Sequence, residues 1–286
     1  MFKNLVGNEE VKQYLKSTIE SNNISHSYMF VGIQGIGKRL FAREYAKNIM
    51  CLQNGECEDK CNSCIKFKAK SNPDYYEIEP DGKSIKIDQV RELQKKIAEK
   101  PITSKKKVYV INNADFMTEE SQNCLLKRLE EPPEYATIIL IVSNESKILP
   151  TIKSRCITIK FKKLKNAEIK KYLPEVPDEL IEILQGSLEG AETIEKKRQQ
   201  YEETYKIVNQ LINGTIIETL NTSDILYTDK DEIMNYLNYM NLMFFKKRIL
   251  KPIEIIEETK KKISSNNNYE MTIDYLLLKC WEKIHK

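Results

Sequence analysis

Two apolar runs, at residues 108–111 and 136–142, limit the folds open to this chain more than any other feature of its sequence. Both are rich in β-branched residues and show no regular alternation with polar residues, which is typical of strands buried on both faces. Such strands occur in parallel sheets that helices cover on both sides. The sequence therefore predicts an α/β domain with a parallel sheet.

The rest of the first 163 residues fits this prediction. Apolar spacing predicts further strands at 27–31, 74–78 and 157–161, and helices at 38–50, 88–100 and 118–131. Asp88 is a candidate N-cap for the second of these helices, which should end before Pro101. Strands that alternate with helices at this spacing indicate one α/β domain over residues 1–163.

Beyond Leu164 the apolar spacing becomes helical throughout, with predicted helices at 166–172, 178–185 and 191–212. The pattern continues from residue 216 to the end, with a polar break at 264–268. We expect Tyr236, Tyr239, Met240 and Met243 on the inner face of a helix. These patterns predict a small helical domain at 164–209 and an all-α C-terminal domain at 210–286.

Charge and hydropathy exclude some functions. The net charge of +4 arises from mixed signs, so it does not by itself indicate nucleic-acid binding. The run Lys105–Lys107 has two interpretations, a contact to DNA phosphates or, as we favour, a solvated turn before a strand. The chain lacks an apolar run of the roughly 18 residues that a membrane helix needs and has no secretory signal features. We expect a cytoplasmic protein without a membrane partner.

A glycine-rich segment between a predicted strand and a predicted helix fits the phosphate-loop pattern G-x-x-x-x-G-K. Gly32, Gly37 and Lys38 are its candidate phosphate-binding residues, because backbone N–H groups and a lysine can surround phosphate oxygens. An ordinary glycine-rich turn is the alternative. The next position holds Arg39 where hydrolysing phosphate loops have a Ser or Thr ligand for Mg²⁺, and a guanidinium cannot bind a cation.

A second part of the expected ATPase site is also altered. The strand at 108–111 leads into Asn112 and Asn113, where an ATPase of this type needs carboxylates for Mg²⁺ and for the attacking water. Neutral amides carry no charge and accept no proton. The sequence therefore predicts a degenerate ATPase fold without Mg²⁺-dependent hydrolysis, that is, not an enzyme. It leaves open whether nucleotide still binds.

Four of the seven cysteines lie close together in the sequence. Cys51, Cys57, Cys61 and Cys64 follow the spacing C-x5-C-x3-C-x2-C, which predicts a tetrahedral structural zinc site within residues 51–64. Four reduced thiols without a metal are the alternative.

The remaining acidic and thiol groups have simpler interpretations. Cys124, Cys156 and Cys280 are expected to be core thiols. Glu130 and Glu131 point about 100° apart on a helix, so we expect a solvated helix end rather than a pair of catalytic carboxylates.

Several motifs in the α/β part resemble one family. The chain resembles the clamp-loader subunits of bacterial DNA polymerase III, members of the AAA+ family, and among them the non-hydrolysing delta-prime type. The matching segments are 25–30, 113–118, Leu125-Leu126-Lys127-Arg128-Leu129-Glu130-Glu131-Pro132-Pro133, 149–152 and Ser154-Arg155-Cys156.

The resemblance implies a function and a set of partners. The chain would be a stator in a complex with tau/gamma ATPase subunits and the delta subunit, which loads the sliding clamp on primer–template DNA. The helical parts would be a lid at 164–209 and a collar at 210–286. Arg155, flanked by Ser154 and Cys156, would act in trans as an arginine finger for the neighbouring ATPase site.

Two details depart from the family pattern. Related subunits carry a four-cysteine zinc module at this place with different internal spacing, and the departure makes Cys57 the ligand in question. A lid motif G-S-x-R has Glu189 in place of its arginine, after Gly186 and Ser187. Two other functions stay open, an active tau/gamma-type ATPase and a stand-alone zinc-dependent nucleic-acid-binding protein.

Overall fold

A computed structural model describes the whole chain except residues 3, 175, 177, 184–185, 188–190 and 265–268. Two compact units divide it. The first comprises Met1–Glu175 with Leu184–Glu189, and the second comprises Val176–Ile183 with Gly190–Lys286. The finer division of the helical part into a domain at 164–209 and another at 210–286 stays a prediction.

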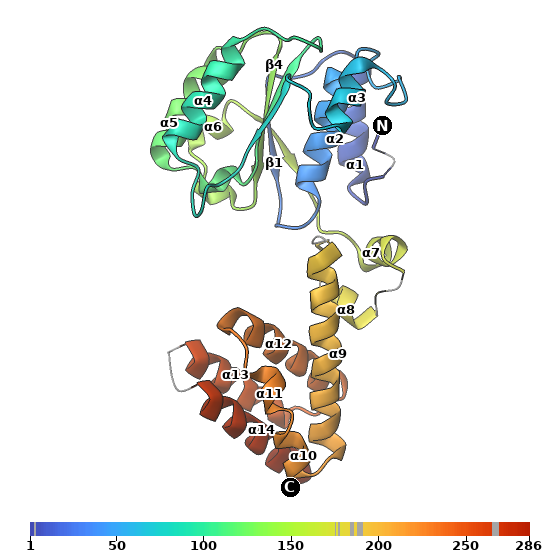
Figure 1. The fold of residues 1–286 in the computed structure, drawn as a ribbon, viewed down its shortest axis with the longest axis vertical. Helices are drawn as coiled ribbons and strands as arrows, with labels where there is room; N and C mark the ends of the chain where they lie inside the picture. The colour runs from blue at the N-terminus through green and yellow to red at the C-terminus, as the bar shows by residue number, and fades with distance from the viewer. Residues whose placement is uncertain (3, 175, 177, 184–185, 188–190, 265–268) are drawn as a thin grey trace. The chain divides into compact units, whose positions relative to one another are not determined.

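A five-stranded, fully parallel sheet forms the centre of the first unit, as the sequence predicts. Its strand order is β2-β3-β4-β1-β5 (Figure 1). The strands are β1 (Ser27–Val31), β2 (Tyr75–Ile78), β3 (Lys107–Ile111), β4 (Ala136–Val142) and β5 (Ile157–Lys160). Val31 pairs with Val142, and Ile111 pairs with Leu140, so the carboxyl ends of the three central strands meet at one edge.

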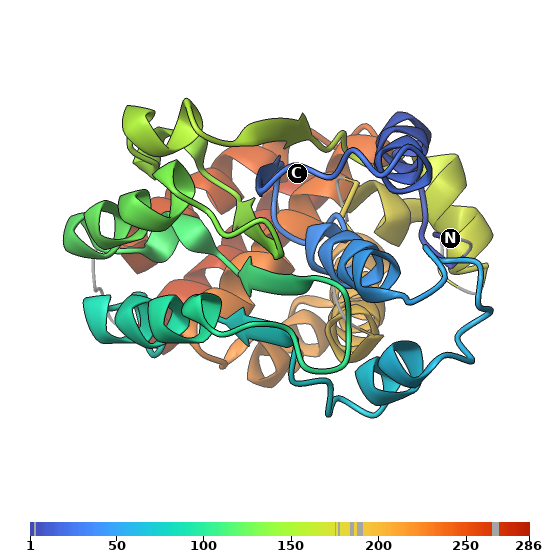
Figure 2. The same ribbon diagram turned by 90° about the horizontal axis from the view of Figure 1, so that it is seen from above.

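Helices cover both faces of this sheet, as Figures 1 and 2 show. Side chains of a strand alternate between the faces, and Tyr28 and Phe30 therefore enter one apolar cluster while Met29 enters the other. The first cluster contains side chains of α1 (Glu9–Glu20) and α2 (Lys38–Met50), and the second those of α4 (Ile87–Ala98), α5 (Glu119–Glu130) and α6 (Pro150–Lys153). The strands are thus buried on both sides.

Short elements complete the first unit. They are α3 (Asn62–Lys68), the 3₁₀ turns η1 (Ala114–Phe116) and η2 (Glu145–Lys147), and α7 (Asn166–Tyr172). Two predictions about this unit are wrong. Lys86, not Asp88, is the N-cap of α4, since Gln89 bonds back to the Lys86 N–H. Lys107 does not lie in a solvated turn, because it is the first residue of β3 and is buried.

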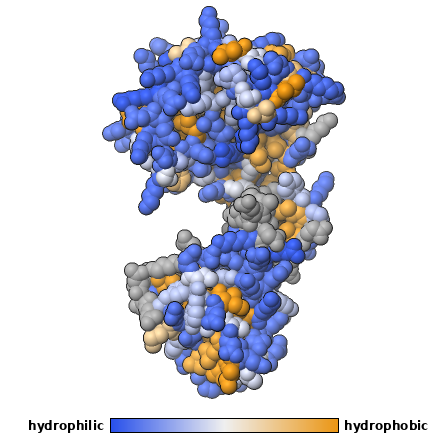
Figure 3. Space-filling model, in the orientation of Figure 1, coloured by the Kyte–Doolittle hydropathy of each residue, from blue (hydrophilic) through white to orange (hydrophobic). Residues whose placement is uncertain are grey.

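The second unit is helical. It consists of α8 (Asp178–Ile183), α9 (Ala191–Asn213), α10 (Ile216–Leu220), α11 (Ser223–Leu226), α12 (Lys230–Lys246), α13 (Lys251–Ser264) and α14 (Tyr269–His285). The expected inner-face residues of α12, Tyr236 to Met243, are buried in its apolar core. Hydrophilic residues cover much of the surface of each unit in the view of Figure 3. No helix in the described part of the chain has the length and apolarity needed to cross a bilayer.

The first prediction concerns the sheet. Ile139 in β4 has no exposed surface, whereas Ile102 in a loop is 76% exposed. Ile139→Ala should lower the free energy of unfolding by about 2–5 kcal/mol, because it removes buried methyl groups and leaves a cavity. The matched control Ile102→Ala should change it by less than about 0.5 kcal/mol. Urea unfolding followed by circular dichroism measures both, and equal losses would contradict the assignment of β4 to the core.

Candidate functional site

The glycine-rich loop lies at the sheet edge where β1, β3 and β4 end. The loop connects β1 to α2. Its last glycine, Gly37, is the N-cap residue of α2 and has a φ of 87°. Such a left-handed backbone favours glycine. Gly32 is close-packed, since a Cβ there would lie 2.9 Å from the carbonyl oxygen of Phe161. The sequence prediction of a strand, loop and helix in this order is confirmed.

Lys38 fills the loop with its own side chain. Its Nζ donates to the carbonyl oxygens of Gly32 at 2.5 Å and Ile33 at 2.7 Å, and to Ser143 Oγ at 3.2 Å. Burial lowers the pKa of Lys38 to about 8, against the opposing effect of the Asp115 carboxylate. The ammonium is therefore held by the loop itself.

Arg39 points away from the loop toward β2. Its Nε lies 2.5 Å from Glu77 Oε1, and its Nη2 lies 3.1 Å from Glu79 Oε2. Arg43 and the Tyr75 hydroxyl also contact Glu77, at 3.7 Å and 2.7 Å. The position that carries a metal-binding hydroxyl in a hydrolysing phosphate loop thus holds a cation that is paired with two carboxylates.

The chain after β3 has no carboxylate at the two positions that follow the strand. Asn112 is buried, and Asn113 has a left-handed backbone with a φ of 51°. The next carboxylate, Asp115, accepts hydrogen bonds from the backbone N–H groups of Ser143 and Asn144, both at 3.1 Å. Asp115 ties the loop after β3 to the loop after β4 and was not identified as a site residue from the sequence.

Arg155 lies at the opposite edge of the sheet, where the strands begin, and directly follows α6 and its C-cap residue Ser154. Its Nη1 donates to the Thr151 carbonyl at 2.9 Å and to Ser154 Oγ at 3.3 Å, and its Nη2 lies 2.7 Å from Glu130 Oε1. The Arg155 carbonyl accepts from Ser27 Oγ at the start of β1, at 2.5 Å. Glu130 is therefore more than a solvated helix end.

Cys156 follows Arg155 and is partly buried against the second apolar cluster. Burial raises the pKa of its thiol to about 11, so it is a neutral thiol at neutral pH. Cys280 is a fully buried core thiol, and Cys124 is partly buried. These environments fit packing roles for all three.

A second residue missed by the sequence analysis is Gln122, which is buried in α5. Its side-chain oxygen accepts from the Leu149 N–H at 2.9 Å, and its nitrogen donates to the Lys147 carbonyl at 3.0 Å. These bonds fix α5 to the segment that carries Arg155. The sequence did carry a signal for this role, because Gln122 lies three positions before Leu125 and so places a polar side chain on the apolar face of the predicted helix.

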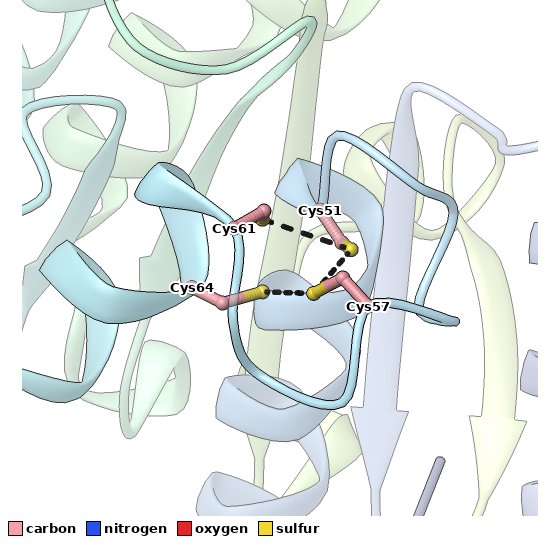
Figure 4. Close-up of side chains that lie close together, drawn as sticks. All are labelled: Cys51, Cys57, Cys61 and Cys64. Atoms are coloured by element: carbon pink, nitrogen blue, oxygen red, sulfur yellow. Dashed lines mark hydrogen bonds between the residues drawn. The ribbon is translucent and has the colours of Figure 1, made fainter.

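The four clustered cysteines come together at the carboxyl end of α2 (Figure 4). The Sγ atom of Cys57 lies 3.3 Å from that of Cys51 and 3.5 Å from that of Cys64, and Cys51 lies 4.0 Å from Cys61. All four sulfurs lie within 4.8 Å of one another. Tetrahedral zinc with Zn–S bonds of about 2.3 Å needs sulfurs about 3.8 Å apart, so this donor set fits the ion.

Backbone N–H groups favour the thiolate form of some cysteines in this cluster, while burial opposes it. The N–H of Gln53 points at Cys51 Sγ, 3.4 Å away. Burial raises the pKa of Cys57, but hydrogen bonds from the Cys61 backbone and the other thiols outweigh it and bring the pKa to about 6. Burial raises the pKa of Cys51 and Cys64. Cys57 is the candidate ligand with the unusual spacing. Its sulfur lies between those of Cys51 and Cys64.

The chain is similar in sequence and in fold to known proteins. A family model described as DNA polymerase III, delta subunit, matches residues 7–165. The delta-prime subunit of DNA polymerase III from Bacillus subtilis is 38% identical over 167 residues, which cover 58% of this chain and 50% of the relative. A gamma/tau subunit from Mycoplasma genitalium is 30% identical over 99% of this chain and 53% of its own length. The chain thus spans about half the length of these relatives.

A solved structure has a similar fold. It is a DNA polymerase III gamma-subunit-related protein from Thermotoga maritima, with a TM-score of 0.56 and 18% identity, covering 95% of this chain and 99% of that one. The parallel sheet, the phosphate loop and the helical region define the fold class of the chain, which is an AAA+-like P-loop fold. Within that class, the chain belongs to the DNA polymerase III delta subunit family.

One sequence-based interpretation lies outside the described residues. The candidate lid motif begins at Gly186 and Ser187, which the structure describes. Glu189, which stands where the motif has an arginine, lies in the undescribed range 188–190. The Gly186 carbonyl accepts from the Leu164 N–H at 3.0 Å. The charge reversal at Glu189 stays a prediction.

The second prediction tests the cysteine cluster. Cys57→Ser should lower bound zinc from about one equivalent to well below it, because the sulfur between Cys51 and Cys64 is lost. The matched control Cys124→Ser, outside the cluster, should keep the wild-type zinc content. Mass spectrometry of metals in protein purified without chelators measures both. Equal zinc in the two variants would exclude Cys57 as a ligand.

Proposed function

We propose that this protein is a non-hydrolysing subunit of a DNA polymerase III clamp loader. The observation that carries the proposal is the pairing of Arg39 with Glu77 and Glu79. Any Mg²⁺ that bridged phosphates at this loop would lack its hydroxyl ligand, because Arg39 stands at that position and pairs with two carboxylates instead.

The other parts of the site support the same conclusion. Asn112 and Asn113 supply neither a metal ligand of negative charge nor a base for the attacking water. Asp115, the nearest following carboxylate, is already occupied by two backbone N–H groups. Lys38 is bonded to carbonyl oxygens of its own loop, which a phosphate would have to replace. Nucleotide binding, if it occurs, would therefore be weak and without turnover.

Arg155 gives the subunit a role in a neighbour's chemistry. An arginine placed against the γ-phosphate of ATP stabilises the charge that develops during transfer, with effects on the order of 10³–10⁵ in rate. The Arg155 side chain is 34% exposed, and its guanidinium contacts residues of α5 and α6 rather than being buried in the core. Such a side chain is available to an ATPase subunit of the tau/gamma type packed beside it. The delta subunit, the sliding clamp and primer–template DNA would be reached through the complex.

Zinc in this proposal has a structural role only. Four cysteine ligands leave no open coordination position for water or substrate. The ion would hold the segment from α2 to α3 in place.

An active ATPase subunit is the second candidate, because the gamma/tau relative from Mycoplasma genitalium matches nearly the whole chain. The two candidates differ in one measurable property, ATP turnover by the isolated chain.

The third prediction is that the isolated chain releases phosphate from ATP no faster than a buffer blank, with Mg²⁺ present, because both metal-binding positions are altered. A coupled steady-state assay, run beside the cognate tau/gamma subunit as a positive control, measures the rate. Turnover that disappears in Lys38→Ala would contradict the proposal and favour an active ATPase.

The fourth prediction concerns the assembled complex. Reconstituted with cognate tau/gamma and delta subunits, Arg155→Ala should lower the clamp- and DNA-stimulated ATPase rate by at least about tenfold, since one site would lose its charge-stabilising residue. Lys153→Ala, two residues away on α6, is the matched control and should leave the rate near wild type. An unchanged rate in an Arg155→Ala complex of normal composition would rule out the finger role.

A further inference from the structure

Glu130 occupies a position that its own helix disfavours. It is the last residue of α5, and Glu131 follows it at the C-cap. A carboxylate at a helix C-terminus faces the negative end of the helix dipole, whereas Lys127 and Arg128 in the same turn suit it. Residues that break a local preference in this way often have a compensating partner at a functional site.

The partner of Glu130 is Arg155. The Glu130 carboxylate oxygen lies 2.7 Å from Nη2, so the two side chains form a close ion pair. On the other side of the guanidinium, Nη1 donates to the Thr151 carbonyl and to Ser154 Oγ. Ser154 is itself bonded to Thr151, 3.0 Å away. Arg155 is thus held between α5 and α6.

This arrangement leaves part of the guanidinium available. Arginine has five N–H donors. The hydrogen bonds above use those of Nη1, while Nη2 faces the Glu130 carboxylate as an ion pair. Among the described residues, no acceptor is bonded to Nε, and the side chain is about one-third exposed. The unused donors lie on adjacent nitrogens and suit the oxygens of a phosphate group.

We propose that Glu130 is a positioning residue for Arg155. It fixes the guanidinium so that the unused N–H donors meet the phosphates of ATP bound to the neighbouring subunit. This inference rests on the proposed role of Arg155 in trans. Because a long arginine side chain loses rotamer freedom when it is fixed on a ligand, fixing it beforehand favours the bound geometry.

The charge of Glu130 has a smaller effect than its position. Both side chains of the pair are partly exposed, at 34% and 49%, so water and salt screen the attraction. The carboxylate therefore cancels little of the charge that Arg155 offers to a phosphate. Its contribution is mainly the direction in which the guanidinium points.

The fifth prediction tests this role in the reconstituted complex. Glu130→Ala should lower kcat for ATP by about threefold to tenfold with KM nearly unchanged, because a group that acts in the transition state is misplaced. Glu130→Gln keeps a neutral acceptor and should fall between Glu130→Ala and wild type. The matched control Glu131→Ala removes the same charge one residue further along and should behave as wild type.

Two further measurements separate positioning from a structural effect. Glu130→Ala should not slow a complex that already carries Arg155→Ala, and its melting temperature and subunit composition should match those of Glu131→Ala. An equal slowing with and without Arg155 would overturn the inference, and so would identical rates for Glu130→Ala and Glu131→Ala. If Arg155→Ala itself has no effect, the proposed finger role fails and the inference falls with it. If Arg155→Ala slows the complex while Glu130→Ala does not, only the inference fails.

Discussion

The burial of β3 and β4 on both faces is the constraint on which the first unit depends. Their backbone groups are removed from water and must bond to neighbouring strands, and parallel pairing with β1 and β2 satisfies them. That pairing brings the ends of three strands to one edge. The phosphate loop, the two asparagines and the loop after β4 then meet there, and Asp115 connects two of these segments.

At this edge the polar groups pair with one another. Lys38 bonds to carbonyls of its own loop, Arg39 pairs with carboxylates in and just after β2, and Asp115 accepts backbone N–H groups. Each of these pairs satisfies a polar group that a nucleotide complex would otherwise use. The same pairs also connect neighbouring segments of the sheet edge and so stabilise the frame, which can persist whether or not the chain hydrolyses ATP. A gamma/tau subunit, from Mycoplasma genitalium, is 30% identical to this chain over 99% of the chain's length.

Periodicity predicted the strands to within one residue, because runs such as 136–142 are long and their burial pattern is uniform. The strand–loop–helix order of the phosphate loop and the approach of the four cysteines were also predictable from their spacing, whereas zinc binding by these cysteines stays a prediction. The N-cap of α4 was not, because the Gln89 side chain reaches back to Lys86 and favours an earlier start. Gln122 and the pair between Glu130 and Arg155 join residues about 25 positions apart, and no local pattern encodes such contacts.

The helix α2 begins at the phosphate loop with Lys38 and ends directly before Cys51, the first residue of the cysteine cluster. Its 13 residues span about 18 Å at 1.5 Å per step. Isolated helices fray from their ends. Both ends of α2 are fixed by neighbouring structure, the first by the glycine turn and the last by the cysteine cluster. A bound ion would therefore hold the segment after α2 and, through the helix, also limit the motion of the phosphate loop at its other end.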